Sequence, residues 1–343
     1  MLEIRQLDSA SEPRWESFVR VCPQASFFHK AGWSRVIENS FNQKTHFLYA
    51  EEDGEIRAIL PLVHVKSRLF GNGLISTAFT VGGGVAANDT TARDAMDKHA
   101  VSLCKQLGAS FVEYRSVETV PAGWQRRDDL YANFSREIAV TEDDCLKQIP
   151  RKQRAVVRKA LDAGLSCSID ADVDSFFDLF AASVHRLGTP VQSKQYFVNL
   201  LAEFGPDSCD VLTIRHAGKP MSSVLSFYFR DTVLPYYTGG AVAARLVGAN
   251  DLMYWRLMRS ARERGYKIFD FGRSKIGTGP YSFKKNWGFE PAPVVHAYHL
   301  ADGAEMPNTN PANPKYQLLI KAWQRMPLML ANFIGPHIVR GIG

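Results

Sequence analysis

Signatures of several common enzyme classes are missing from this 343-residue sequence. It has no Gly-x-Ser-x-Gly elbow, no Walker loop and no Gly-x-Gly-x-x-Gly after a strand pattern. The glycine-bounded run at residues 272–277 is one residue too long for the elbow. The sequence therefore gives no sign of an elbow-type serine hydrolase, a P-loop nucleotide hydrolase or a dinucleotide-dependent oxidoreductase.

Cysteine and histidine are too scattered for a metal or redox site. His296 and His299 have no carboxylate or cysteine at ligand spacing. The cysteines form no Cys-x-x-Cys pair; they are Cys22, Cys104, Cys145, Cys167 and Cys209. We expect reduced, mostly buried thiols, no metal ion and no required cofactor.

Long apolar runs are absent as well. The N-terminus has no basic stretch followed by an apolar one, and no segment reaches the roughly 18 apolar residues that a membrane span needs. We predict a cytoplasmic protein, and contact with the inner face of the membrane stays an open alternative. The formal charge of +6 favours anionic partners such as phosphates, RNA or a negatively charged membrane.

The chain is long enough for two domains, and its apolar pattern repeats once. In the first half, strand patterns at residues 45–50 and 55–65 form a hairpin, and a helix at 90–107 leads through Gly108 into a strand. The second half repeats this order from residue 211 to 272. The segments CKQLGASFVEYRS (104–116) and ARERGYKIFDFGRS (261–274) share a helix end, a glycine, an apolar strand and a closing Arg-Ser. Hairpins combined with strand-helix-strand crossovers predict an α+β fold, a mixed and mostly antiparallel sheet flanked by helices in each half.

A helix with one basic face is predicted between the halves, from Pro150 to Gly164. Its cations share one arc and are Arg151, Lys152, Arg154, Arg158 and Lys159. This face is either solvated surface or a binding surface for a phosphate-rich ligand such as tRNA, a nucleotide sugar or a lipid diphosphate.

The segment with the most chemistry is the loop at residues 270–291, which follows a predicted strand. Gly277 and Gly279 let backbone amides approach a ligand. The cations Arg273, Lys275, Lys284 and Lys285 can meet anionic oxygen. The alternative is a surface loop that Phe283, Trp287 and Phe289 anchor to the core.

These motifs, taken in order, resemble the Fem peptidyltransferase (FemAB-like) branch of the GNAT-related proteins. The closing motif of that branch resembles Phe-Lys-Lys-x-Trp-Gly at residues 283–288, after the glycine-rich loop. Similar segments are FFHKAGWSRV, IPRKQRAVVRKALDAGL, HRLGTPVQSKQYF and LPYYTGG. The resemblance covers nearly the whole chain and implies two tandem GNAT-like (acyl-CoA N-acyltransferase-like) domains. Within the family the chain is most similar to the FemAB-related proteins of exosortase (PEP-CTERM) and exopolysaccharide systems.

The resemblance implies an aminoacyltransferase or other N-acyltransferase. Its donor would be aminoacyl-tRNA or another acyl carrier, and its acceptor an amine of a cell-envelope, peptidoglycan (cell-wall) or exopolysaccharide precursor. By motif position, Lys284 would stabilise the oxyanion, Tyr237 would position the nucleophile, and Asp270 is the candidate base or else a turn cap. The expected substrate-binding residues are Arg273, Lys285, Tyr236, Tyr196, Arg186, Arg151, Arg154 and Tyr281. The aromatic residues among them read equally well as packing residues.

One departure from the family and one partial match to another pattern leave alternatives open. Relatives that use a UDP-linked acceptor carry a lysine where this chain has Ile37, which places the UDP-peptidoglycan acceptor in doubt. The run from Arg245 through Gly248 to Asn250 partly matches the GNAT pyrophosphate loop, so these residues are candidates for binding acyl-CoA. That pattern favours an acyl-CoA-dependent N-acyltransferase of polysaccharide biosynthesis as a rival. A non-catalytic protein that binds the precursor is the second rival.

We therefore predict a first GNAT-like domain at residues 1–140 and a second at 141–308 that carries the active site. Residues 309–343 are predicted as a helical tail that packs on the first domain. Because the tail mixes large apolar residues with Lys315, Lys321, Arg325 and Arg340, the alternative is a membrane-surface segment that suits a lipid-linked acceptor.

Overall fold

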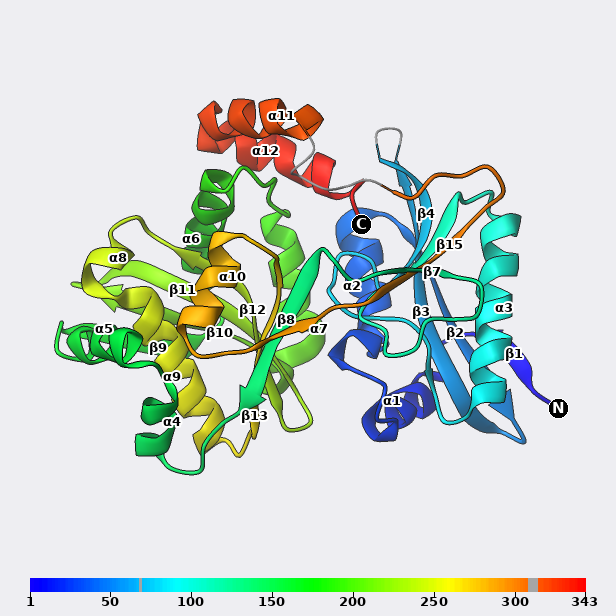
Figure 1. The fold of residues 1–343 in the computed structure, drawn as a ribbon, viewed down its shortest axis with the longest axis horizontal. Coiled ribbons are helices and arrows are strands. Elements are labelled where there is room, and N and C mark those ends of the chain that lie inside the picture. Colours follow the sequence, from blue (N-terminus) through cyan, green and yellow to red (C-terminus); the bar gives the residue numbers. More distant parts are fainter. Residues whose placement is uncertain (68–69, 308–313) are drawn as a thin grey trace. The chain divides into compact units, whose positions relative to one another are not determined.

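The hairpin expected near residues 45–65 lies in the first of two sheets (Figure 1). A computed structural model describes residues 1–67, 70–307 and 314–343, with only the backbone for 314–317. The described chain forms two compact units. The first contains residues 1–130, 294–307 and 337–343, and the second contains residues 131–293 and 314–336.

Alternating apolar residues build the sheet of the first unit. β2 (Lys44–Glu52) and β3 (Glu55–Ser67) pair antiparallel across a turn in which Asp53 and Gly54 have positive φ. The helix expected at 90–107 is α3 (Thr90–Gln106), which begins at the cap Asp89 and packs on this sheet. The described strands follow the order β1-β2-β3-β4-β6-β15-β7, with β5 paired to β3. The other elements are β1 (Glu3–Gln6), α1 (Glu12–Val21), the 3-10 helix Phe27–His29, α2 (Gly32–Phe41), β4 (Gly71–Ser76), β5 (Ala86–Ala87), β6 (Phe111–Tyr114), β7 (Gln125–Arg127) and β15 (His296–Leu300).

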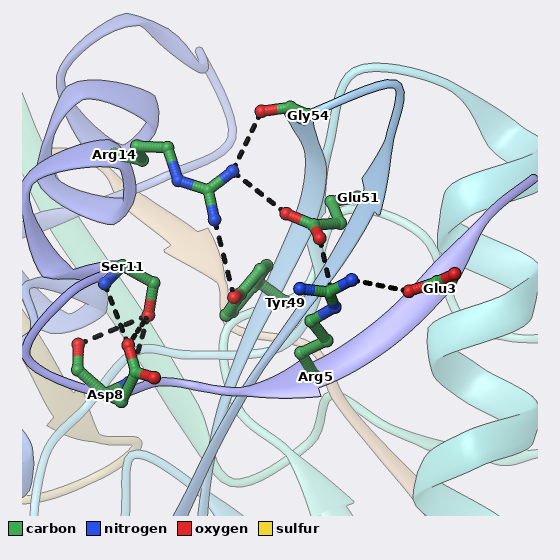
Figure 2. A network of polar contacts seen from close by, with 8 residues as sticks. All are labelled: Glu3, Arg5, Asp8, Ser11, Arg14, Tyr49, Glu51 and Gly54. Carbon is green, nitrogen blue, oxygen red and sulfur yellow. Dashed lines mark hydrogen bonds and ion pairs between the residues drawn. The ribbon is translucent and has the colours of Figure 1, made fainter.

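A polar network holds the edge strand of this sheet (Figure 2). The carboxylate of Glu51, on β2, is 3.0 Å from the Arg5 guanidinium of β1 and 2.9 Å from the Arg14 guanidinium of α1. Arg14 also donates to the Gly54 carbonyl at 2.8 Å. The buried Glu51 carboxylate thus joins a strand to a helix, and Arg14 extends the network to the turn, so the network has a structural role.

The second unit repeats the crossover of the first. β12 (Thr232–Gly240), α9 (Ala249–Glu263) and β13 (Ile268–Lys275) correspond to β4, α3 and β6, and both strand pairs are parallel. The sheet order is β14-β8-β13-β12-β11-β10-β9. The remaining elements are β8 (Tyr131–Glu137), α4 (Glu142–Gln148), α5 (Arg151–Leu161), β9 (Leu165–Asp170), α6 (Val173–Arg186), α7 (Lys194–Ser208), β10 (Cys209–His216), β11 (Lys219–Phe229), α8 (Ala244–Val247), α10 (Gly279–Asn286), β14 (Pro291–Pro293), α11 (Pro314–Arg325) and α12 (Leu328–Val339). The expected mixed, mostly antiparallel sheets with flanking helices are confirmed.

Helices cover both faces of the second sheet. Leu212 and Val224 point into the core that α9 completes with Leu252 and Trp255. Phe227, three residues beyond Val224 on β11, instead packs edge-to-face against Phe204 of α7. Because neighbouring strand residues point to opposite faces, α9 lies on one face and α7 on the other. Within the described ranges, no helix has the length and hydropathy that crossing a bilayer requires.

The predicted domain boundaries at residues 140 and 308 differ from the observed division. β8 pairs with β13 and therefore belongs to the second sheet, although it precedes residue 140. β15 pairs with β6 and β7 and therefore belongs to the first sheet, although it precedes residue 308. Pairing between strands far apart in the sequence caused the difference.

The tail also differs from its prediction. Residues 314–336 group with the second unit rather than the first, and 337–343 group with the first; residues 309–313 lie outside the described chain. His185, at the end of α6, is 3.0 Å from the Trp323 carbonyl of α11, and Gln324 donates to the Arg186 carbonyl at 2.8 Å. A Cβ on Gly188 would lie 2.4 Å from Ile320, so the missing side chain allows α11 to pack here.

Candidate active site

Two parallel strands diverge at the centre of the second sheet. β12 and β13 are paired only at Thr232↔Ile268 and Val233↔Phe269 within the described chain. Further along, β12 stays paired with β11 as far as Gly240, and β13 stays paired with β8 as far as Lys275. The backbone groups on the two facing edges therefore have no ladder partner across the gap. Such groups need other hydrogen-bond partners, which a ligand amide or acyl group can supply.

Irregular backbone marks the divergence on both strands. The register of β11 with β12 shifts between Leu225 and Ser226, and the extra residue on β12 is Tyr236. The register of β13 with β8 shifts between Asp270 and Arg273. Gly272, in this second bulge, has a φ of 68°, a left-handed conformation that favours glycine.

The side of the gap that faces α9 is filled by aromatic side chains. The Tyr254 hydroxyl donates to the Thr238 hydroxyl of β12 at 3.0 Å. The Tyr254 ring packs 4.7 Å from the Phe271 ring of β13 and 6.0 Å from the Trp287 ring. Burial raises the pKa of Tyr254 to about 12. Tyr254 thus bridges the two diverging strands, and neither its position nor its role was visible in the sequence.

On the opposite face, two tyrosine hydroxyls meet. The hydroxyl oxygens of Tyr196, on α7, and Tyr237, on β12, are 2.8 Å apart, and both side chains are buried. Burial raises the pKa of both phenols, whereas the positive charge of Arg273 lowers the pKa of Tyr237. Arg273 stacks on the Tyr131 ring at 4.4 Å. The structure therefore brings two predicted site residues, Tyr196 and Tyr237, into contact, and the charge of a third, Arg273, acts on Tyr237.

Lys284 of α10 binds the bulge on β13. Its ammonium donates to three consecutive carbonyls, those of Phe271 at 2.6 Å, Gly272 at 2.9 Å and Arg273 at 3.1 Å. Burial lowers the pKa of Lys284 to about 8, and the charge of Asp270 opposes that shift. An ammonium has three N–H donors, so this geometry uses all of them. To reach an oxyanion, the ammonium must release one carbonyl.

Asp270 is the acid beside this lysine. Its Oδ1 accepts from the Gly272 amide at 2.8 Å and from the Asn133 amide group at 3.0 Å. Burial raises the pKa of Asp270, and these two hydrogen bonds and the Lys284 charge oppose the shift. Asp270 therefore caps the turn at Gly272 through Oδ1. Its other oxygen, Oδ2, has no protein donor among the described residues.

A single inserted residue distinguishes this strand from its counterpart in the first unit. Residues 111–116 read FVEYRS, and residues 268–274 read IFDFGRS, so Gly272 is the addition. In the first unit Arg115 is paired with Glu113 at 2.9 Å, and Glu113 is also bonded to His296 at 3.0 Å. His296 thus has a structural partner. The extra glycine was the sequence signal for the bulge that Lys284 binds.

The residues predicted to bind acyl-CoA lie at the N-terminus of α9, which is closely packed by other elements. Arg245 is exposed on α8, Gly248 has a φ of 68°, and Asn250 is in the first turn of α9. A Cβ on Gly248 would lie 3.0 Å from Val156 and 3.1 Å from Ala160, because α5 packs against this turn.

A buried carboxylate occupies the same first turn. Asp251 accepts hydrogen bonds from Gln153 of α5 and, at 2.9 Å, from the Trp287 indole. Burial raises its pKa. A bound diphosphate would meet both α5 and this acid. Within the described residues, no group of three His, Cys, Asp or Glu side chains is arranged to hold a metal ion.

The remaining predicted residues are spread around the unit. Arg151 is exposed on α5, whereas Arg154 donates to the carbonyls of Lys147 and Ile149. Tyr281 packs 5.2 Å from the Phe134 ring, and the exposed Lys285 is 6.0 Å from the Tyr281 ring. Tyr236 packs on Phe227 at 5.1 Å, and Arg186 donates to the Gly240 carbonyl.

Comparisons with known proteins agree with this architecture. The sequence profile of the acetyltransferase (GNAT) domain matches residues 146–285, which contain the diverging strands and Lys284. The crystal structure of FemX is similar with a TM-score of 0.69 and 14% identity, over 93% of this chain and 100% of that chain. A tandem GNAT protein from the clavulanic acid biosynthesis pathway has a TM-score of 0.57 and 13% identity, over 89% and 100%.

A third similar structure is the C-terminal domain (DUF2156) of a protein assigned as a lysylphosphatidylglycerol synthetase from Agrobacterium fabrum. Its TM-score is 0.57 with 15% identity, over 85% of this chain and 93% of that chain. A search of curated proteins finds no match to the sequence. Residues 146–285 therefore match the acetyltransferase (GNAT) domain, and the chain has a tandem GNAT-like fold similar to that of FemX.

Proposed function

We propose that the second unit transfers an aminoacyl group from aminoacyl-tRNA to an amine of a cell-envelope or exopolysaccharide precursor. The observation that carries the proposal is the divergence of β12 and β13, which leaves the two strands without a ladder between them beside the Tyr237 hydroxyl, Arg273 and Lys284. An acyl transfer needs polar donors for the carbonyl oxygen and a place for the nucleophile, and this gap offers both.

The crowded start of α9 supports tRNA over acyl-CoA as the donor. α5 packs on Gly248, and Asp251 is buried in the same turn, so the helix amides that would bind a diphosphate already lie against protein. α5 instead presents exposed cations without an acidic partner among the described residues: Arg151, Lys152, Arg158 and Lys159. A run of free cations on one helix suits a polyanionic donor.

The reaction joins the acceptor nitrogen to the ester carbonyl carbon. As the C–N bond forms, the carbonyl electrons move to oxygen, and the Lys284 ammonium stabilises that oxyanion after it releases one carbonyl of the bulge. Asp270 takes the proton from the attacking amine at Oδ2, since burial has raised its pKa. The C–O bond to the tRNA then breaks, and the departing oxygen receives that proton.

Two tyrosines and an arginine position the acceptor in this proposal. The hydroxyl of Tyr237 is held by Tyr196, and the Arg273 charge lies near it. Both phenols stay neutral at physiological pH because burial raises their pKa, so they act as hydrogen-bonding groups. An acceptor of an exosortase-associated or exopolysaccharide system, with a lipid-linked precursor, follows from the family resemblance. The similar structure assigned as a lysylphosphatidylglycerol synthetase is named for an aminoacylated lipid, which supports that acceptor class.

The test supplies the purified chain with labelled aminoacyl-tRNAs and labelled acyl-CoAs in parallel. Each donor is combined with extracted envelope and polysaccharide precursors, and transfer of label to the precursor is measured. We expect label to move from tRNA and not from CoA. Transfer from acyl-CoA without tRNA would instead support the acyl-CoA-dependent enzyme. Precursor binding without transfer from any donor would support the non-catalytic protein.

A further inference from the structure

We propose that residues 318–336, the C-terminal helix pair, dock the second unit on an anionic membrane surface. The pair consists of the side-chain-described part of α11 and the part of α12 that belongs to the second unit. Two residues, Met326 and Pro327, join the helices. The proposal concerns where the protein binds, and it does not depend on the identity of the acyl donor or acceptor.

The outer face of α12 is apolar. Met329 is 84% exposed and Phe333 is 72% exposed, and they lie four residues apart, so they share one side of the helix. Ala331 and Gly335 lie on the opposite side and are buried; a Cβ on Gly335 would lie 2.9 Å from the Val191 carbonyl. The helix is therefore held by its small residues and presents its large apolar residues outward.

α11 adds a second apolar and basic surface. Its buried side carries Trp323, which packs toward α6, and its exposed side carries Leu318 at 75% exposure. Lys321 and Arg325 are also exposed on this helix. Neither cation has an acidic partner within the described residues.

The charge pattern selects an anionic partner. From residue 307 to residue 343 the sequence contains no Asp or Glu, although the whole chain has 35 of them. In the same segment stand Lys315, Lys321, Arg325 and Arg340. An apolar helix face beside cations, without a single acid, is the arrangement that binds the interface of an anionic bilayer. A protein partner with an apolar groove would not require the acids to be absent.

The location within the second unit fits a lipid-linked acceptor. α11 is bonded to the end of α6 through His185 and Arg186. Arg186 also donates to the Gly240 carbonyl, at the end of β12, and α6 packs along β12. The chain continues from α6 to α7, which carries Tyr196 of the tyrosine pair. The proposed membrane surface is thus built on the elements that flank the candidate site.

The experiment measures binding of the full chain to vesicles of phosphatidylcholine with one quarter phosphatidylglycerol, and to vesicles of phosphatidylcholine alone, by co-sedimentation. The double variant Met329→Gln with Phe333→Gln should lower the affinity for the anionic vesicles at least tenfold, because it removes the apolar contact. The control is Val242→Gln with Leu246→Gln on the same unit, since these residues are equally exposed at 74% and 79%. This control should bind like the unaltered chain.

A second pair of variants tests the charge. Lys321→Glu with Arg325→Glu should weaken binding to the anionic vesicles at least tenfold, and raised salt should weaken the unaltered chain in the same direction. Lys98→Glu with Lys105→Glu, which changes two exposed cations of α3 in the first unit, is the matched control. Because the substituted residues are exposed, we expect each variant to fold. Circular dichroism and thermal melting check this.

Three results would overturn the proposal. One is equal sedimentation of the Met329 and Phe333 double variant and the unaltered chain. Another is equal binding to the two kinds of vesicle. The third is a dimer in solution that this double variant converts to a monomer, with no vesicle binding by either form, since the face would then be covered by a second copy of the chain. None of these outcomes changes the label-transfer assay, so this proposal and the proposed function fail separately.

Discussion

The Lys284 ammonium lies 2.6 Å from the carbonyl oxygen of Phe271, thirteen residues earlier in the chain. The next two carbonyls complete its hydrogen bonding, so a side chain from α10 holds a bulge on β13. The bulge forms where β13 diverges from β12. Lys284 therefore stabilises the backbone at the gap and is also the candidate for the catalytic cation. The predictions below separate these two roles.

Replacing Lys284 by Met should lower the rate of transfer by roughly 100- to 1000-fold, the usual cost of losing an oxyanion donor. It should also destabilise the unit, because three carbonyls lose their shared donor. Lys285→Met is the control, since Lys285 is exposed beside it. Single-turnover rates well below the melting transition distinguish the roles: a folded K284M protein with the unaltered rate would leave the lysine with a structural role alone.

The pKa of Lys284 predicts opposite effects of pH on rate and on stability. In the folded protein this pKa is about 8, lowered from 10.5. The transfer rate should therefore fall as pH rises through about 8, because the ammonium loses its proton. Between about 8 and 10.5 the unfolded chain binds this proton more tightly than the folded chain. The contribution of Lys284 to the free energy of unfolding therefore becomes more favourable as pH rises across that window.

Lys284→Arg is the control for this pH dependence, because a guanidinium stays protonated. The fall in rate near pH 8 should disappear in K284R, even if the absolute rate is lower. A rate profile with the same descending limb in both proteins would assign that limb to another group. Transfer rates and urea unfolding, each measured from pH 6.5 to 10, supply the comparison.

Gly272→Ala tests the bulge through its backbone. The φ of 68° is strained for alanine although no atom lies within 4 Å of the added Cβ, so we expect a loss of about 1 kcal/mol in the free energy of unfolding. Gly277→Ala is a matched control, because its φ is 79° and its Cβ site is equally open. Both variants should lose similar stability, whereas only G272A should lower the transfer rate. Equal rates in the two variants would contradict a functional role for the bulge.

Much of this architecture follows from local patterns, and the rest depends on contacts between distant segments. Alternating apolar residues predict both hairpins, and glycines after helical runs predict α3 and α9 correctly. The alternation does not say that β8 pairs with β13 or that β15 pairs with β6, because either strand fits any open sheet edge.

The site shows the same division. The composition of the loop at residues 270–291 points to Lys284, but the acceptors of its ammonium are backbone carbonyls, which no side-chain pattern reveals. The residues around Gly248 resemble a pyrophosphate loop, and only the structure shows that α5 packs against them. Asn133 and Tyr254 enter the site from β8 and α9 without any motif of their own.

The tyrosine pair predicts coupled effects of two substitutions. Tyr196→Phe and Tyr237→Phe each remove the hydrogen bond between the two buried hydroxyls and should each cost roughly 1–3 kcal/mol of stability. The double variant should cost less than the sum, because each single variant already removes the hydrogen bond between the two hydroxyls. Urea unfolding of the four proteins measures this coupling. In addition, Y237F should raise the KM for the acceptor amine, and an unchanged KM would remove Tyr237 from acceptor binding.

The exposed cations of α5 predict how binding of the donor depends on salt. Each phosphate contact adds about 0.7 to 0.9 to the slope of log affinity against log salt. Arg151→Glu with Arg158→Glu should therefore weaken tRNA binding and lower that slope by about 1.4 to 1.8. The control is Lys98→Glu with Lys105→Glu on α3, which makes the same change in charge. This control should leave the salt dependence of tRNA binding unaltered. Filter binding with aminoacyl-tRNA from 50 to 300 mM salt gives both values. If the two double variants behave alike, α5 does not contact the donor, and its basic face is only solvated surface.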